Sequence, residues 1–401
     1  MKRLLQINVV ANSGSTGRIA ERIGSLAISN NWESFIAYGR WANKSDSKLI
    51  KIGNKFEIIL HGINSILFDK HGLSSSIATQ KLIKTIIKIN PDIIHLHNIH
   101  GYYINYKILF EFLKQYNKPI IWTLHDCWAY TGHCVHYTAI GCCKWKVLCN
   151  KCPYSYSYPK ALVDRSQKNY LEKKKAFTSI NNLTIVTVSE WLKNEVKQSF
   201  LNKFDIKKIY NGIDTSIFHP CDNNVKVNYN IRDKFLIISV ATQWIKNKGL
   251  DDFLELSKSL GEKDIIMLIG LTKQQIKKLP QNIIGIPNIN NINELINIYS
   301  AADLYISFST EETFGMTIIE SMSCGTPVLA YKSTASPELI NDKVGKCIQP
   351  HDINSACEFI NEVKAKGKAF YIESCIHHVK EKFDINKTIS QYITLYNTIT
   401  K

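Results

Sequence analysis

The chain of 401 residues has no run of eighteen or more apolar residues, so the sequence predicts no transmembrane helix. It has no low-complexity tract and no short-period repeat, which argues against a repeat architecture. Arginine-rich tracts and the signatures of nucleic-acid-binding modules are missing as well. A hydrophobic content of 45% supplies a sizeable core, and the length suggests two globular domains.

Acidic residues are too few to balance the basic ones. The 34 Asp and Glu face 50 Lys and Arg, which gives a formal charge of +16. Such an excess suits nucleic acid, anionic lipid or an anionic substrate. Because the lysines are spread along the chain, we expect weak contact with an anionic membrane surface and no nucleic-acid binding. Part of the excess is also consistent with codon bias toward Lys, Asn and Ile.

The first ten residues, Met-Lys-Arg-Leu-Leu-Gln-Ile-Asn-Val-Val, imitate the start of a signal peptide. The apolar stretch is short, contains Gln6 and Asn8, and runs into a Gly–Ser loop. We therefore expect a first core strand and a cytoplasmic protein.

Apolar strand-like runs alternate with helical patterns along the whole chain, which predicts an α/β fold with parallel sheets. The expected strands are 4–10, 34–38, 93–96, 120–124 and 183–188 in the first half, and 207–210, 235–240, 265–269, 282–286, 304–307 and 327–330 in the second. The expected helices are 17–30, 80–89, 106–116, 164–179, 191–199, 250–260, 292–300, 316–323 and 386–399. The turn signal Asn211-Gly212 predicts a domain boundary near 200–210, giving domains 1–205 and 206–383.

The most informative motif is Glu312-Thr-Phe-Gly-Met-Thr-Ile-Ile-Glu320, followed by Ser-Met-Ser-Cys-Gly-Thr-Pro327. It lies between two apolar runs, so it predicts a strand, a loop with one carboxylate, a helix with a second, and another strand. Ligands bind at the carboxyl ends of such strands, and a helix N-terminus suits phosphate. A phosphate between two hydroxyl-binding carboxylates fits a nucleotide sugar. The alternative is a solvated helix with two incidental glutamates.

This segment resembles the signature of retaining glycosyltransferases of family 4. The resemblance implies the GT-B fold: two Rossmann-like domains facing a central cleft, with a C-terminal helix, residues 384–401, crossing back to the first domain. It implies that Glu312 contacts the donor sugar and that Glu320 binds the ribose hydroxyls. The start of the following helix, at Gly315, Met316 and Thr317, is the expected phosphate contact.

Two further loops match the family. Asn12-Ser-Gly-Ser-Thr-Gly-Arg18 is similar to its Gly-rich loop after the first strand, which implies donor contacts from Gly14, Gly17 and Arg18; the alternative is a plain turn. The run ending in Lys248-Gly249 resembles the diphosphate-binding element, but its usual arginine falls near Gln243. Lys246 and Lys248 are therefore the expected cations, with a solvated lysine run as the alternative.

Histidines end two expected strands. Thr123-Leu-His-Asp126 matches a family element in which the histidine lies against the donor sugar, so His125 joins Glu312 as an expected catalytic residue, with Asp126 orienting its ring. The run with His95, His97 and His100 also resembles the family. We expect these three to shape the cleft or core rather than to bind metal.

Six of the eleven cysteines lie between Cys127 and Cys152, within an expected insertion at 127–153. Cys149-x-x-Cys152 has zinc-ligand spacing, and a cytoplasmic setting disfavours stable disulfides. Structural zinc on Cys134, Cys142, Cys149 and Cys152 is the preferred interpretation. Cys143, His133 and His136 are competing ligands; buried reduced thiols or a redox disulfide are the alternatives. The insertion resembles a subgroup associated with bacterial exopolysaccharide and colanic-acid-type synthesis.

The expected activity is transfer of a sugar, with retention, from a UDP- or GDP-sugar to a glycan or lipid-linked acceptor in surface polysaccharide synthesis. The family implies no catalytic metal, and the chain has no Asp-x-Asp triplet. The expected site is cytoplasmic, at the inner face of the bacterial plasma membrane. The alternatives are a non-catalytic zinc-stabilised binding protein and a GT-B enzyme acting on a soluble sugar phosphate.

Overall fold

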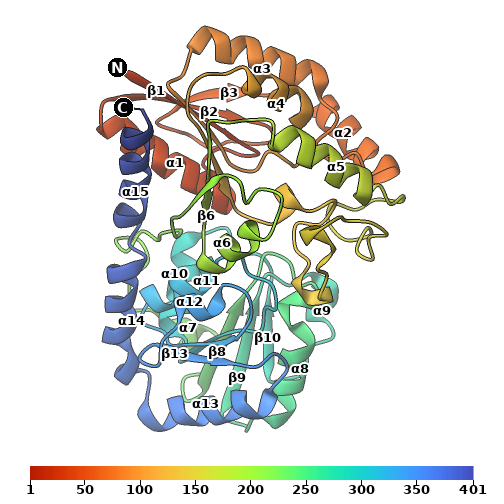
Figure 1. The fold of residues 1–401 in the computed structure, drawn as a ribbon. Helices are drawn as coiled ribbons and strands as arrows, with labels where there is room; N and C mark the ends of the chain where they lie inside the picture. Colours follow the sequence, from red (N-terminus) through yellow and green to blue (C-terminus); the bar gives the residue numbers. More distant parts are fainter. Residues whose placement is uncertain (401) are drawn as a thin grey trace. The chain divides into compact units, whose positions relative to one another are not determined.

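The computed structural model describes residues 1–400 and divides them into two domains. Among these residues, the first consists of 1–210 and 389–400, and the second of 211–388. Each domain has one parallel sheet with helices packed on it (Figure 1).

The first domain has a seven-stranded sheet in the order β3-β2-β1-β4-β5-β6-β7. All its strand pairs are parallel. The strands are β1 (Lys2–Asn8), β2 (Trp32–Tyr38), β3 (Lys48–Lys51), β4 (Ile93–Leu96), β5 (Ile120–Leu124), β6 (Leu183–Thr187) and β7 (Asp205–Lys208). The helices are α1 (Gly14–Ser29), α2 (Lys55–Phe68), α3 (Ser76–Ile89), α4 (Tyr106–Lys114), α5 (Ser166–Phe177) and α6 (Glu190–Lys197).

The second domain has a six-stranded parallel sheet in the order β10-β9-β8-β11-β12-β13. Its strands are β8 (Phe235–Val240), β9 (Asp264–Ile269), β10 (Ile283–Ile286), β11 (Leu304–Ser307), β12 (Val328–Tyr331) and β13 (Gly345–Ile348). Its helices are α7 (Val225–Asn228), α8 (Leu250–Ser259), α9 (Lys273–Ile276), α10 (Ile292–Ala301), α11 (Met316–Ser323), α12 (Ser336–Leu339), α13 (Ile353–Lys366) and α14 (Ala369–Lys382).

Each sheet has a switch point, at which the direction of strand addition reverses. In the first domain the chain builds outward from β1 in one direction and then resumes beside it with β4; in the second, β8 and β11 play these parts. Central strands are buried on both faces, as in β9, where every residue is buried, so the sequence there is a continuous apolar run. The expected α/β parallel fold is confirmed.

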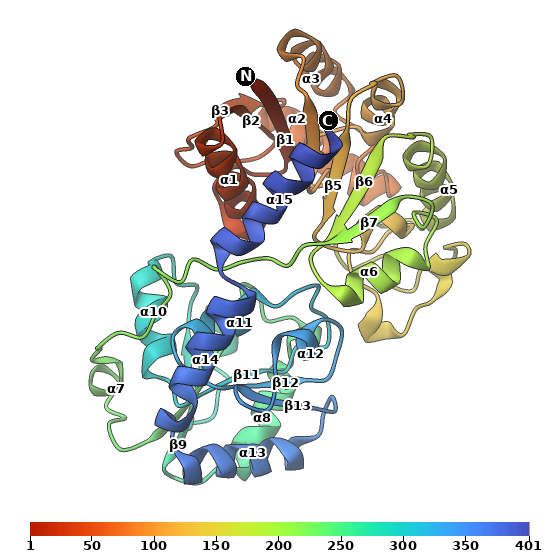
Figure 2. The same cartoon turned by 60° about the vertical axis from the view of Figure 1, so that its left-hand side comes forward.

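The last helix, α15 (Ile385–Ile399), begins in the second domain and continues into the first. Its tyrosines, Tyr392 and Tyr396, are buried in the first domain. The Tyr396 hydroxyl lies 2.6 Å from His95 Nδ1, and its ring packs on Trp32. Figure 2 shows α15 running along the first domain beside α1.

One strand belongs elsewhere than expected. The sequence places a strand at 207–210 in the second domain, but β7 pairs with β6 and completes the first sheet. The chain leaves the first domain after residue 210 instead of 205. The Asn-Gly turn therefore follows the boundary by one residue and does not mark the end of a strand in the second domain.

Candidate active site

The second-domain site is built on the loops that follow β8 and β11, at the switch point where open α/β sheets bind ligands. The β8 loop carries Lys248, and the β11 loop carries Glu312. Lys248 Nζ lies 2.5 Å from Glu312 Oε1 and 3.3 Å from Ser309 Oγ. The structure therefore brings together two residues that lie 64 positions apart in the sequence.

Two glycines shape these loops, and the first of them lets the β8 loop lie against the end of β11. Gly249 has φ +75°, and a Cβ there would lie 2.4 Å from the Cβ of Phe308. Gly315 has φ +107° and directly precedes α11. Neither conformation suits a residue with a side chain, so the sequence pattern Lys-Gly and Phe-Gly encodes this loop packing.

The helix α11 begins directly after the β11 loop, with Met316 and Thr317 in its first turn. No side chain caps this helix, so its first-turn N–H groups suit an anion. Glu320, one turn further, accepts a 2.9 Å hydrogen bond from the Tyr299 hydroxyl. Lys246 is exposed at the start of the short helical turn that carries Lys248.

Sequence reasoning missed a supporting pair. Asn247 donates a 2.5 Å hydrogen bond from Nδ2 to Oε2 of the buried Glu311, and the Thr310 N–H donates to the Asn247 carbonyl. These contacts join the β8 loop to the β11 loop beside Lys248. The only sequence signal is that each residue is adjacent to a predicted site residue.

In the first domain, the Gly-rich loop after β1 has two different glycines. Gly14 is exposed with φ +59°, and nothing lies within 4 Å of a Cβ built there, so a ligand has access. Gly17 is buried, and a Cβ there would lie 3.0 Å from Val10 Cγ2. Gly17 thus serves the packing of α1 on the loop, while Gly14 and the exposed Arg18 remain on the surface.

The predicted histidines lie at the carboxyl ends of β4 and β5 and form a chain of contacts. His97 Nε2 lies 3.0 Å from Gln6 Oε1, and His97 Nδ1 lies 3.2 Å from His125 Nε2. Gln6 Nε2 donates to the Ala20 carbonyl, which leaves Gln6 Oε1 as the acceptor facing His97. Consequently His97 carries its proton on Nε2, His125 donates from Nε2, and Nδ1 is the acceptor nitrogen of His125.

Burial keeps these rings neutral. It lowers the pKa of His125 to about 4, partly opposed by Asp126. It also lowers the pKa of His95 to about 3. His95 is held by Tyr396 and Thr123, so its role is in the core, as expected.

Both carboxylate oxygens of Asp126 have partners other than His125, so its orienting role stays a prediction. Its Oδ2 lies 2.8 Å from His100 Nε2, and its Oδ1 accepts the Trp128 N–H. Burial opposes ionisation, but His100 and the Trp128 hydrogen bond lower the pKa of Asp126 to about 2. His97, which the sequence offers only as a cleft-wall residue, contacts the His125 ring directly.

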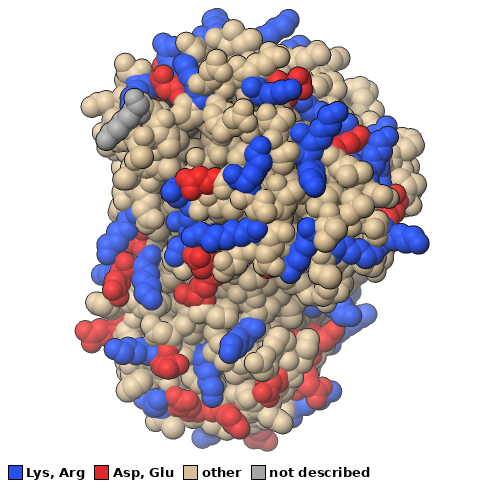
Figure 3. Space-filling view, viewed as in Figure 1, with Lys and Arg blue, Asp and Glu red and all other residues tan. Residues whose placement is uncertain are grey.

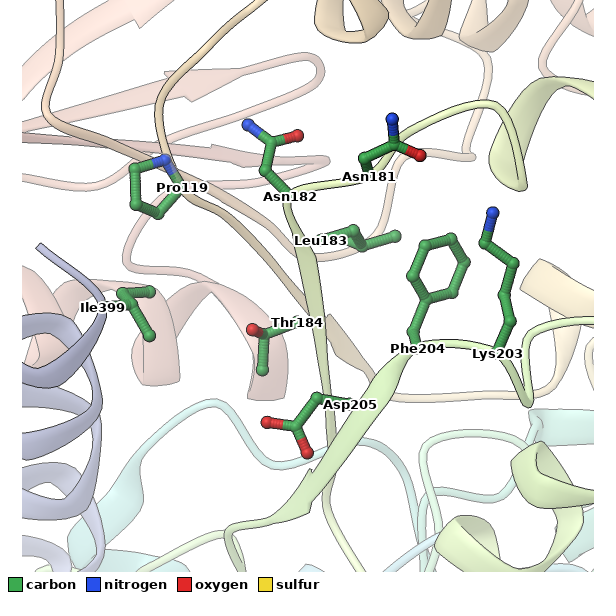
Figure 4. Close-up of a pocket in the computed structure, with 9 residues that line it drawn as sticks. All are labelled: Pro119, Asn181, Asn182, Leu183, Thr184, Lys203, Phe204, Asp205 and Ile399. Atoms are coloured by element: carbon green, nitrogen blue, oxygen red, sulfur yellow. The ribbon is translucent and has the colours of Figure 1, made fainter.

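A cavity of about 330 Å³ opens at this carboxyl edge of the first-domain sheet. Its lining includes His100, Asp126, Arg40 and Tyr158, together with Val135 and His136 from the insertion. A hollow of about 400 Å³ on the same domain is lined by residues at the amino-terminal starts of β5, β6 and β7 (Figure 4). Because ligands of open α/β sheets bind at carboxyl ends, the smaller cavity is the candidate acceptor pocket.

The insertion is anchored by a buried lysine. Lys173 Nζ donates to the Trp128 and Thr131 carbonyls and lies 3.6 Å above the Trp128 ring. Burial lowers the pKa of this lysine to about 7.

The four predicted cysteine ligands line one small cavity of about 10 Å³. Cys134 and Cys152 approach to 3.9 Å between sulfurs, and Cys149 accepts the Gly132 N–H. Within residues 1–400, however, no three His, Cys, Asp or Glu side chains are gathered as ligands for a metal ion. The fold brings the thiols to one place but does not assemble the predicted tetrahedral set.

His133 lines the same cavity. Its Nδ1 lies 2.7 Å from Asp69 Oδ1, and its buried Nε2 has no hydrogen-bond partner. A carboxylate on one ring nitrogen with the other left open is the arrangement of metal-binding histidines. His133 is therefore a stronger competitor of Cys142 for the fourth ligand position than its sequence position indicates.

No helix in the described part of the chain is both long and apolar enough to cross a membrane. Comparison with protein families matches residues 36–217 to Glycosyltransferase Family 4 and residues 222–370 to Glycosyl transferases group 1. The putative colanic acid biosynthesis glycosyl transferase WcaC of Escherichia coli K12 is 23% identical, covering 87% of this chain and 88% of that protein. The N-acetyl-alpha-D-glucosaminyl L-malate synthase of Bacillus anthracis is 25% identical over 56% of this chain and 64% of that protein.

Solved structures show the same fold over the full length. Sucrose-phosphate synthase from Thermosynechococcus elongatus superposes with a TM-score of 0.72 at 15% identity, covering 99% of both chains. HepE from Anabaena in complex with UDP gives 0.67 at 15% identity, covering 99% and 100%. WaaG, a glycosyltransferase involved in lipopolysaccharide biosynthesis, gives 0.68 at 15% identity, covering 99% of both. The chain is thus a glycosyltransferase with the GT-B fold, built from a Family 4 domain and a group 1 domain.

Proposed function

We propose that this enzyme transfers a sugar from a UDP- or GDP-sugar to a hydroxyl of a glycan or lipid-linked glycan during assembly of a surface polysaccharide. The contact that supports this most directly is Lys248 with Glu312 at the β8–β11 switch point. The names of two similar proteins agree with it, since WcaC is assigned to colanic acid biosynthesis and HepE was crystallised with UDP-glucose.

The donor would bind through its charges. Negative charge grows on the leaving diphosphate as the glycosidic bond breaks, and preorganised cations and helix N-termini stabilise it. Lys248, Lys246 and Arg18 would supply the cations, and the first turn of α11 the N–H groups. Glu320, held by Tyr299, would accept hydrogen bonds from the ribose hydroxyls.

Glu312 and His125 would act on the sugar. With its pKa near 4, His125 is neutral at physiological pH, so it would serve as a hydrogen-bonding group rather than an acid. Glu312 would accept a hydrogen bond from a hydroxyl of the donor sugar while remaining ion-paired with Lys248.

We propose retention through front-face attack. The acceptor oxygen bonds to the anomeric carbon as the bond to the diphosphate breaks, and the acceptor proton passes to a phosphate oxygen. The enzyme's contribution would be to hold both partners in place. Lipid-linked acceptors would bring the enzyme to the inner face of the plasma membrane.

The cysteine cavity would have a structural role. We propose zinc bound by Cys134, Cys149 and Cys152, with Cys142 or His133 as the fourth ligand. Thiolate and imidazole are suitable zinc donors, but the side chains would have to move toward one another, since no ligand set is assembled among the described residues.

The test begins with a screen of UDP- and GDP-sugars for hydrolysis and for transfer to lipid-linked and soluble acceptors. NMR of the product's anomeric carbon reports retention or inversion. Transfer only to a soluble sugar phosphate would favour that acceptor class, and no turnover with any donor would reject the proposed activity.

A binding experiment isolates the ribose contact. Calorimetry should show that the wild type binds UDP or GDP more tightly than the 2′,3′-dideoxy analogue, and that Glu320→Ala loses this preference. Glu373→Ala, at an exposed position on α14, is the matched control. An undiminished preference in Glu320→Ala would remove Glu320 from the ribose site.

A further inference from the structure

The helix α2 exposes its apolar side. Seven large apolar side chains on this helix of fourteen residues are exposed, while its buried residues are His61 and Ser65. Phe56 is 67% exposed, Ile59 59% and Ile63 45%. The remaining exposed apolar residues are Leu60, Ile66, Leu67 and Phe68. A surface helix normally buries its apolar stripe and exposes its polar one, so α2 is reversed.

Hydrogen bonds fix this reversed orientation. His61 Nε2 accepts the Gly72 N–H at 3.0 Å, and its Nδ1 lies 2.9 Å from Ser75 Oγ. Asn64 donates to Ser74, and Asn54 with Glu57 forms a capping box at the N-terminus. Rotating the helix to bury its apolar side would leave these polar groups without partners, which is costly.

The apolar surface extends beyond the helix. The Leu162 N–H donates a 2.7 Å hydrogen bond to the Ile66 carbonyl, so the segment with Leu162 and Val163 lies against the C-terminal half of α2. These two side chains are 67% and 47% exposed. Figure 1 shows α2 at the outer rim of the first domain. Contiguous exposed apolar surface marks an interaction site.

The charges on the segment that carries α2 are mostly basic, although the exposed Asp164 directly follows Val163 at the edge of the apolar surface. Residues 47–91 contain seven lysines and only two acidic residues, Glu57 and Asp69. Asp69 is buried against His133, and Glu57 is engaged in the capping box. Lys55 and Lys70 flank the helix at its two ends, and Lys70 Nζ lies 5.4 Å from the Phe68 ring. On the face shown in Figure 3 the charges of both signs are mixed, so a segment this free of exposed acid stands out.

We propose that α2 docks the enzyme on an anionic lipid bilayer. The helix would lie in the plane of the membrane with its apolar side chains at the boundary of headgroups and acyl chains, and the lysines would contact lipid phosphates. The apolar side chains suit the acyl chains of a bilayer, and the lysines suit the negative charge of its headgroups. This inference stands apart from the chemistry of the transfer, since no proposed site residue lies on α2.

Vesicle flotation of the full chain tests it. The wild type should bind vesicles of phosphatidylcholine with about one-third phosphatidylglycerol, bind pure phosphatidylcholine more weakly, and lose binding at high salt. Ile59→Ser with Ile63→Ser should weaken binding at least about tenfold, because less apolar area enters the bilayer. Phe370→Ser, at an equally exposed apolar position on α14, is the control and should bind as the wild type does.

Two further measurements complete the test. The double variant should keep its thermal midpoint and its transfer to a water-soluble acceptor, which separates loss of docking from misfolding and from failure of the proposed chemistry. Undiminished vesicle binding by the double variant would overturn the inference. A concentration-dependent dimer that the double variant abolishes, without vesicle binding by the wild type, would instead show that α2 joins two copies of the chain.

Discussion

Lys248 is the residue whose charge the proposed donor site needs most. Its ammonium group already contacts Glu312 and Ser309, so its position is fixed before a ligand arrives. We expect Lys248→Met to weaken UDP or GDP binding by about 1.5–3 kcal/mol, the usual range for a hydrogen bond to a charged group. Calorimetry measures this directly.

The control for Lys248 is Lys258→Met, which removes an exposed lysine that pairs with Glu255 on α8. It should leave nucleotide affinity unchanged. Equal losses in the two variants would mean that general charge, and not the switch-point lysine, attracts the nucleotide.

Gln6 contacts His97, which contacts His125, and we expect it to position His125 through that ring. We expect Gln6→Leu to lower kcat by about tenfold while the donor KM stays unchanged, since roughly 1.4 kcal/mol of orientation would be lost. Gln80→Leu, at an exposed position on α3, is the control. A matching rise in donor KM would argue that Gln6 supports the general structure of the domain.

The positions of site residues were predictable where the chain carries local patterns, whereas their roles stay predictions. Glu312, Glu320 and Lys248 lie in motifs with glycine turns, and the structure places them at the switch point of one sheet. The partnership of Asp126 with His100 was not predictable, because the two lie 26 positions apart and follow different strands. The same holds for Asn247 and Glu311, which meet only when two loops fold together.

At the scale of elements, buried parallel strands were the easiest to predict. The expected ranges of β4, β5, β8, β11 and α11 agree with the observed bounds, because continuous apolar runs end at clear turn residues. The exposed edge strand β3 and the short β13 lack such runs and were missed. The helix α2 was missed as well, as were α13 and α14.

The insertion offers a prediction about metal. We expect protein purified without chelator to contain about one zinc ion per chain and to lose it to strong chelators, with a lower thermal midpoint, because metal binding stabilises the folded loop. Elemental analysis and thermal denaturation measure both. Cys149→Ser should act like the chelator, whereas Cys221→Ser in the second domain is the control. Native protein free of zinc would reject the site.

At the scale of the molecule, buried neutral histidines are concentrated in the first domain. Burial lowers the pKa of His61 and His125 to about 4 and that of His95 to about 3, and it lowers the pKa values of His71 and His97 well below their usual range. Unfolding returns each ring to water, where its pKa is about 6.5.

We therefore expect the first domain to lose stability as pH falls below about 6.5. In that range the unfolded chain binds protons that the folded domain does not, so each ring contributes about 1.4 kcal/mol per pH unit. Above pH 6.5 the contribution is constant. Hydrogen exchange at pH 7.5 and 5.0, corrected for intrinsic rates, should show lost protection in residues 1–210 and little change in 211–388. Equal loss in both domains would contradict the assignment.

The path of α15 has a consequence for synthesis of the chain. Tyr392 and Tyr396 fill space against strands made at the very beginning, yet residues 211–388 must all be translated before these rings emerge from the ribosome. Until then, His95 and Trp32 in the nascent amino-terminal half lack their contacts with Tyr396. A nonsense mutation in the last few codons would damage the part of the protein that was made first.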